Sequence, residues 1–125
     1  MEKKLMVVDD EPDVAISVET GLDTLTDKYK VIGVKSGREC FEFLENNEIP
    51  DLILLDIMMP EMSGWDVAAK IKRHPVWGKI PIVFLTAKTD PYSKGFGKIA
   101  SEDYVEKPFE INNLKKRVDA VLARR

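Results

Sequence analysis

Short runs of branched apolar residues alternate along this chain with longer stretches in which apolar residues recur every three or four positions. Strands that alternate with amphipathic helices are typical of βαβ units, in which consecutive strands lie parallel in one sheet. The pattern predicts five strands, at Leu5–Val8, Val31–Val34, Leu52–Leu55, Ile82–Leu85 and Tyr104–Val105. The middle three are almost entirely apolar, as expected of strands that helices cover on both faces.

Five helices are predicted between and after these strands, on both faces of the sheet because the crossovers should be right-handed. Four have clear apolar stripes: Val14, Val18, Leu22 and Leu25; Cys40, Phe43 and Leu44; Val67, Ala68 and Ile71; and Ile111, Leu114, Val118, Val121 and Leu122. Pro12 suits a first helical turn, and Ser36 and Glu39 form a capping box. The fourth helix, between Thr86 and Tyr104, is predicted to be short or frayed because its segment contains proline and glycine.

Composition narrows the class of function. The length of 125 residues suits one domain with a single core. Nineteen basic and 22 acidic residues give a net charge of −3, so no basic field favours nucleic acid or an anionic membrane. No apolar run reaches the length of a membrane span, and the first residues do not resemble a signal peptide, so we expect a cytoplasmic protein. The single cysteine, Cys40, is predicted to be a buried structural thiol.

Polar side chains collect where the predicted strands end. Asp9 and Asp10 follow the first strand, Asp56 the third, Thr86 the fourth and Lys107 the fifth. Ligands of open parallel sheets bind outside the carboxyl ends of the strands, so we expect these five residues at one edge. Three neighbouring carboxylates repel one another unless a cation neutralises them or some hold protons. Oxygen ligands without histidine or cysteine favour Mg²⁺.

Four motifs in this chain resemble those of a response-regulator receiver domain, the partner of sensor histidine kinases. They are LMVVDDEP, DLILLDIMMPEMSG, IVFLTA and YVEKPF, in matching order and spacing along the whole chain. The resemblance implies a flavodoxin-like, doubly wound α/β fold with five parallel strands in the order 2-1-3-4-5 and five helices. It also implies one receiver domain over residues 1–125, without an output domain in this chain.

The resemblance assigns a phosphoryl-transfer role to the acidic residues. Asp56 matches the phosphoacceptor, which receives its phosphoryl group from a histidine kinase. Asp9 and Asp10 match the acidic pair that holds Mg²⁺ together with Asp56, with Asp10 as the more direct ligand. The backbone carbonyl of Met58 matches a further metal ligand. The module would catalyse only its own phosphorylation and dephosphorylation and would not be an enzyme with a separate substrate.

The resemblance also assigns the signalling step. Thr86 and Lys107 match the hydroxyl and ammonium groups that contact the phosphoryl group, and Thr86 and Tyr104 match the switch residues. The Lys107-Pro108 peptide bond is cis in the family. The readout surface would comprise the fourth helix, fifth strand and fifth helix. The implied partners are a sensor histidine kinase or phosphotransfer protein and an unnamed downstream protein, and a homodimer through the readout surface stays open.

Each of these residues also has an ordinary structural explanation. Asp10 could cap the first helix, Thr86 could be a strand-end threonine, Lys107 a solvated charge and Tyr104 an edge-strand aromatic residue. Two other classes of function stay open. One is an aspartyl-phosphate hydrolase, although such enzymes usually carry Asp-x-Asp after the first strand. The other is a receiver-like interaction module that is never phosphorylated. The chain could be a stand-alone regulator or a piece of a longer protein.

Three more residues are predicted to serve the structure alone. Gly64 should permit the turn into the third helix. Asp51 should make a local contact before the third strand. His74, the only histidine, should be a solvated residue at the end of the third helix, at the edge of the sheet opposite the acidic residues.

Overall fold

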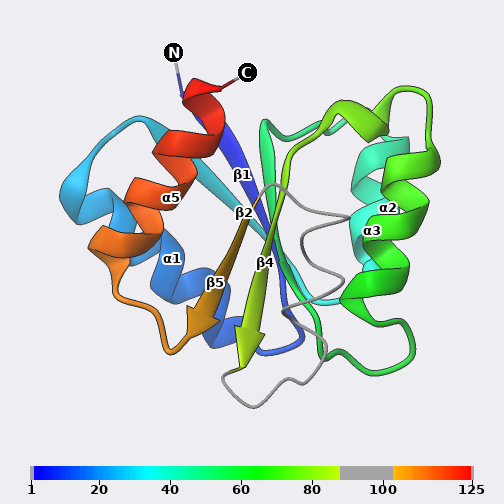
Figure 1. Ribbon diagram of the computed structural model, residues 1–125, viewed down its shortest axis with the longest axis horizontal. Helices are drawn as coiled ribbons and strands as arrows, with labels where there is room; N and C mark the ends of the chain where they lie inside the picture. The colour runs from blue at the N-terminus through cyan, green and yellow to red at the C-terminus, as the bar shows by residue number, and fades with distance from the viewer. Residues whose placement is uncertain (1, 88–102, 125) are drawn as a thin grey trace.

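A computed structural model describes residues 2–87 and 103–124 of the chain. They form three layers, with a parallel sheet between two pairs of helices (Figure 1). The strands are β1 (Lys3–Val8), β2 (Tyr29–Val34), β3 (Leu52–Asp56), β4 (Ile82–Ala87) and β5 (Asp103–Lys107). Their order is β2-β1-β3-β4-β5, so the predicted strand order is confirmed.

The described residues contain four α-helices, which are α1 (Pro12–Leu25), α2 (Gly37–Glu45), α3 (Gly64–Arg73) and α5 (Ile111–Ala123). A short 3₁₀ helix, η1 (Trp77–Lys79), follows α3. The predicted fourth helix falls on residues 88–102, outside the described residues. None of the helices in residues 2–87 and 103–124 is both long and apolar enough to span a membrane.

The starts of the helices agree with the predicted capping signals, with one exception. The Ser36 hydroxyl accepts a hydrogen bond of 3.1 Å from the backbone N–H of Glu39 at the start of α2. Helix α1 begins at Pro12, as predicted, but its N-cap residue is Glu11, which makes no side-chain capping bond. The alternative role of Asp10 as the cap of this helix is therefore wrong.

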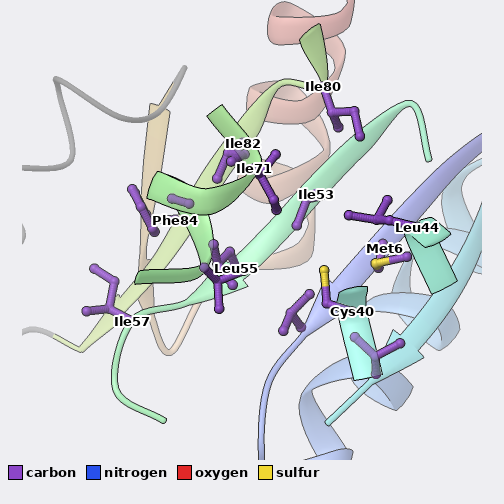
Figure 2. Close-up of a cluster of buried hydrophobic side chains, with 14 residues drawn as sticks. Met6, Cys40, Leu44, Ile53, Leu55, Ile57, Ile71, Ile80, Ile82 and Phe84 are labelled. Atoms are coloured by element: carbon purple, nitrogen blue, oxygen red, sulfur yellow. The ribbon is translucent and has the colours of Figure 1, made fainter. Parts of the chain in front are cut away.

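The core consists of two apolar layers, one on each face of the sheet. Side chains alternate between the faces of a strand, so Leu5 and Val7 of β1 point toward α1 and α5, whereas Met6 and Val8 point toward α2 and α3. Figure 2 shows the layer that faces α2 and α3, in which Phe84 is fully buried. Cys40 lies in the same layer, and burial raises the pKa of its thiol to about 12, as expected of a structural cysteine.

His74 ends α3 and also organises the following turn. Its Nδ1 atom accepts hydrogen bonds of 3.1 Å from the backbone N–H groups of both Val76 and Trp77. The imidazole also stacks on the Trp77 ring, with 3.8 Å between the ring centroids. The predicted place of His74 is confirmed, but the residue is half-buried and bonded rather than simply solvated.

A polar contact that the sequence pattern did not predict joins α5 to the start of β2. The hydroxyl of Tyr29, a residue only 7% exposed, donates a hydrogen bond to Asp119. Lys115 Nζ lies 2.7 Å from the other oxygen of the Asp119 carboxylate. Burial and this acidic partner raise the pKa of Tyr29. Although partial burial opposes it, bonding to Lys115 and Tyr29 lowers the pKa of Asp119.

Replacing Tyr29 with phenylalanine is expected to lower the free energy of unfolding by about 1.5 kcal/mol, because the hydroxyl donates to a charged acceptor. Urea unfolding measures the change. A double-mutant cycle with Asp119→Ala isolates the pair, and the two effects should be strongly non-additive. Additive effects of the two substitutions would show that the bond does not stabilise the fold.

Candidate functional site

Three carboxylates meet where β1 and β3 end side by side. Asp9 and Asp10 follow β1, and Asp56 is the last residue of β3. One oxygen atom from each of the three lies within 4.8 Å of the other two. Asp9 and Asp56 are 2% and 5% exposed, whereas Asp10 is open to solvent. The acidic residues that the sequence placed at one edge are thus gathered into one cluster, in which Asp10 is exposed.

Lys107 reaches this cluster from the end of β5. Its Nζ atom lies 2.6 Å from Asp9 Oδ2 and 3.3 Å from Asp56 Oδ1. Side chains alternate between the two faces of a strand. Asp9 has the same parity as Leu5 and Val7 of β1, and Lys107 has the same parity as Val105 of β5. Leu5, Val7 and Val105 all pack on the α1 and α5 side, so Asp9 and Lys107 are directed to that side as well. The alternative role of Lys107 as a solvated charge is wrong. The Lys107-Pro108 peptide bond is cis, as the motif implied.

Both oxygens of the Asp9 carboxylate are occupied by protein donors. Oδ1 accepts a hydrogen bond of 2.9 Å from the backbone N–H of Glu11, and Oδ2 accepts the Lys107 ammonium. Asp9 therefore orients Lys107 toward Asp56. Sequence reasoning grouped these residues but did not predict that Asp9, rather than Asp56, holds the shorter bond to the lysine. The alternation of side chains along β1 is the sequence signal that could have predicted this, because it directs Asp9, but not Asp10, to the same side as Leu5 and Val7.

The charges of the cluster shift one another's proton affinity. Burial, and then the negative charge of Asp9, raise the pKa of Asp56 to about 6, although Lys107 opposes the shift. Burial acts to lower the pKa of Lys107, but its bond to Asp9 and the charge of Asp56 outweigh burial and raise it. Lys107 therefore stays protonated, and Asp56 is ionised in most molecules at neutral pH.

The loop after β3 is held tightly against the backbone of Asp56. The N–H of Gly64 donates a bond of 2.8 Å to the carbonyl of Ile57, and a Cβ atom on Gly64 would lie only 2.2 Å from the carbonyl oxygen of Asp56. Glycine is therefore required by a close backbone approach, which refines its predicted role in the turn into α3. Ser63 caps α3 by accepting a bond of 3.3 Å from the N–H of Asp66.

The remaining predicted site residues, Thr86, Tyr104 and Met58, come from β4, β5 and the loop after β3. Thr86 is 1% exposed near the end of β4, next to the register pair Ala87 and Lys107. Tyr104 stands opposite Phe84 in β5 and packs on the α2 and α3 side. The side chain of Met58 is 65% exposed. Asp51 accepts a bond of 2.7 Å from the N–H of Lys4 in β1, so its contact is structural but not local as predicted, because it joins positions 47 residues apart.

The sequence profile of the response regulator receiver domain matches residues 5–119. This chain belongs to the receiver domain family of response regulators. The match covers the acidic cluster, Lys107 and most of α5. A receiver domain is a module of two-component signalling.

Individual relatives agree with this assignment. A Vibrio cholerae serotype O1 protein named "Probable cyclic di-GMP phosphodiesterase" is 41% identical over 115 residues, which is 91% of this receiver domain but 25% of that protein. The response regulator SaeR of Staphylococcus aureus is 36% identical over 121 residues, 96% of this chain and 50% of SaeR. The chain thus spans a quarter to a half of these relatives.

The fold is also shared with a solved structure of nearly the same length. A Chloroflexus aurantiacus J-10-fl protein, provisionally assigned as a response regulator, superposes with a TM-score of 0.89 at 34% identity. That match covers 99% of this receiver domain and 100% of the other chain. The flavodoxin-like arrangement expected from the motifs is therefore confirmed for the sheet and the four described helices.

Proposed function

We propose that residues 1–125 form a phosphorylatable receiver domain in which Asp56 accepts a phosphoryl group from the phosphohistidine of a kinase or phosphotransfer protein. The observation that carries this proposal is the grouping of Asp56 with two further carboxylates and with the Lys107 ammonium. An ionised carboxylate can act as a nucleophile toward phosphorus, and a fixed ammonium beside it can neutralise the incoming charge. A cluster with only a structural role would not need both a nucleophilic carboxylate and an ammonium group fixed beside it.

In the proposed transfer, one oxygen of the Asp56 carboxylate attacks the phosphorus atom of the donor. The new O–P bond forms as the P–N bond of the phosphohistidine breaks, and its electron pair stays on the imidazole nitrogen. Lys107 stabilises the negative charge of the phosphoryl oxygens, and Asp9 keeps the ammonium in place from its buried position. Phosphoryl transfer depends mainly on such positioning and electrostatic stabilisation.

The donor set fits a hard divalent cation. Three carboxylate oxygens converge, the described residues of the cluster include no nitrogen or sulfur ligand, and exposed Asp10 leaves an open side for water and phosphate. We propose that Asp10 and Asp56 hold Mg²⁺, with Asp9 beside them and the backbone carbonyl of Met58 as a further ligand. When bound, Mg²⁺ would offset the charge of the phosphoryl oxygens.

We further propose that Thr86 and Tyr104 transmit the new charge to a partner surface. Thr86 is buried near the end of β4, within one register step of Lys107. Thr86 has the same parity as Phe84 and therefore faces the α2 and α3 side, on which Tyr104 also packs. Movement of the hydroxyl toward the phosphoryl group would leave space for the Tyr104 ring. The resulting shift in population would change the surface formed by β5, α5 and the segment before β5, where a downstream protein binds.

The decisive experiment is incubation with acetyl phosphate, with and without Mg²⁺, followed at once by intact-mass measurement. We expect the addition of one phosphoryl group that requires Mg²⁺ and is absent from the Asp56→Asn variant. Asp51→Asn is the matched control, because Asp51 is a carboxylate at the opposite end of β3. This control should be phosphorylated like the wild-type chain.

Failure to gain mass under any condition, in a folded chain that also does not bind beryllofluoride, would leave an interaction module that is never phosphorylated. Turnover of a small phosphate ester that persists in Asp56→Asn would instead indicate a hydrolase. Phosphorylation of Asp56→Asn to the wild-type extent would refute the assignment of the acceptor.

A further inference from the structure

Strand β2 forms one edge of the sheet, and half of its backbone polar groups face away from β1. The N–H of Lys3 donates to the carbonyl of Lys28 at 2.7 Å, and the N–H of Asp9 donates to the carbonyl of Val34 at 3.0 Å. Because both backbone groups of every second residue face the same neighbour in a parallel ladder, the even-numbered residues face β1. The N–H and C=O groups of the odd-numbered residues, 29, 31 and 33, therefore point outward.

This edge lacks most of the devices that usually prevent strand addition. Exposed edges are commonly protected by several charges, by proline or by bulges. In β2 the register with β1 is continuous over six residues, Lys30 is the one charged residue, and Gly33 is exposed and has no side chain to shield its backbone. The edge is thus regular and accessible enough to accept another strand.

An apolar strip of α1 runs beside the same edge. An open groove of about 430 Å³ is lined by Pro12, Ala15 and Ile16 of the helix and by Val31 and Gly33 of the strand, and the charged residues Glu19, Lys35 and Glu39 also line it. Ile16, which lies in this lining, is 58% exposed. Whatever pairs with β2 would therefore also cover Ile16.

We propose that the occupant is a second copy of this chain, paired antiparallel through β2. Exposed Asp27 precedes the strand and exposed Lys35 follows it. In an antiparallel pair centred on Val31, Tyr29 of each copy stands opposite Gly33 of the other, and Asp27, in the bend before the strand, comes near Lys35 in the bend after the partner's strand. In-register parallel pairing would instead place Asp27 against Asp27. Opposite charges across strands are favourable and like charges are not, so the charge pattern selects the antiparallel pair.

The antiparallel pair forms a closed, two-fold symmetric dimer rather than an open chain of copies. The outward N–H and C=O groups of Tyr29, Val31 and Gly33 become paired across the axis. Both α1 helices lie on the same side of the joined sheet, so their Ile16 side chains are covered together. Strand β5 lies at the other edge of the sheet, so this dimer leaves the proposed readout surface free.

Sedimentation velocity of the complete chain over a concentration series tests the dimer. Asp27→Lys is expected to raise the dimer dissociation constant by about tenfold or more, because it creates two Lys–Lys pairs. The double variant Asp27→Lys/Lys35→Asp restores opposite charges and should recover wild-type association. Glu45→Lys, at an exposed position of α2, is the control with the same change in charge, and it should leave the dimer dissociation constant unchanged.

Val31→Pro tests the backbone pairing separately. It removes an outward N–H without removing a bond to β1, so the variant should fold but remain monomeric. The proposal is overturned if the wild-type chain is monomeric throughout the series. It is also overturned if a dimer persists unchanged in Asp27→Lys, since such a dimer would use another surface. If Val31→Pro does not fold, the comparison of Asp27→Lys with the double variant Asp27→Lys/Lys35→Asp still tests the dimer.

Discussion

Gly64→Ala is expected to lower the free energy of unfolding by about 3 kcal/mol, at the upper end of the range for overpacked sites. The added Cβ would lie 2.2 Å from the carbonyl oxygen of Asp56 and 2.8 Å from the Cα atom of Ile57. Both neighbours belong to the backbone, and the N–H of Gly64 is bonded to the carbonyl of Ile57. The loop can therefore relieve the contact only by moving the end of β3.

Chemical unfolding of Gly64→Ala and Gly37→Ala in parallel measures this effect. At Gly37 the new Cβ would meet only side-chain atoms, 2.7 Å from Val67 Cγ2 and 3.0 Å from Met62 Sδ. Side chains can rotate away, so we expect Gly37→Ala to cost about 1 kcal/mol or less. Equal losses at both positions would show that the close approach to Asp56 is not what requires glycine.

The metal-free chain is expected to lose about 3 kcal/mol of folding free energy as the pH rises from about 4 to about 7, owing to Asp56. Burial and the charge of Asp9 raise the folded-state pKa of this carboxyl from 3.8 to about 6. Between these values the folded state binds more protons than the unfolded state. The contribution of Asp56 is therefore complete below the unfolded-state pKa and is lost as the pH rises through the folded-state pKa.

Unfolding by urea at a series of pH values, with a chelator present, tests this expectation. The Asp56→Asn variant cannot titrate at this position, so the wild-type minus variant difference should become steadily more destabilising from pH 4 to pH 7. Mg²⁺ should reduce the loss at neutral pH, because it neutralises the carboxylates. A difference that favours the wild-type chain at higher pH would contradict the assigned sign.

Local sequence signals predicted most of the sheet and the membership of the site. The apolar runs located all five strands, although β5 extends to Asp103–Lys107 and β4 to Ala87, beyond the segments predicted from apolar residues alone. The polar residues that follow these runs, from Asp9 to Lys107, meet because parallel strands end at a common edge. Periodicity and strand direction are local properties, so they can be read without coordinates.

Other features could not be predicted because they join residues that have no local relation. The bond between Tyr29 and Asp119 links positions 90 residues apart, and neither residue interrupts the periodicity of its own element. The alternative explanation of Asp10 as a helix cap was wrong for a related reason: α1 begins at Pro12 without a side-chain cap, and Asp10 lies beside the other carboxylates.

The sequence by itself determined the five strands, the four described helices and the residues that gather at one edge of the sheet. These depend on side-chain alternation, helical spacing and the common direction of parallel strands. Only the tertiary structure decided that Asp9 holds Lys107 at 2.6 Å, and that Gly64 must lack a side chain beside Asp56. Such distances depend on how side chains and loops from separate elements pack, and that packing is not contained in the pattern of any one segment.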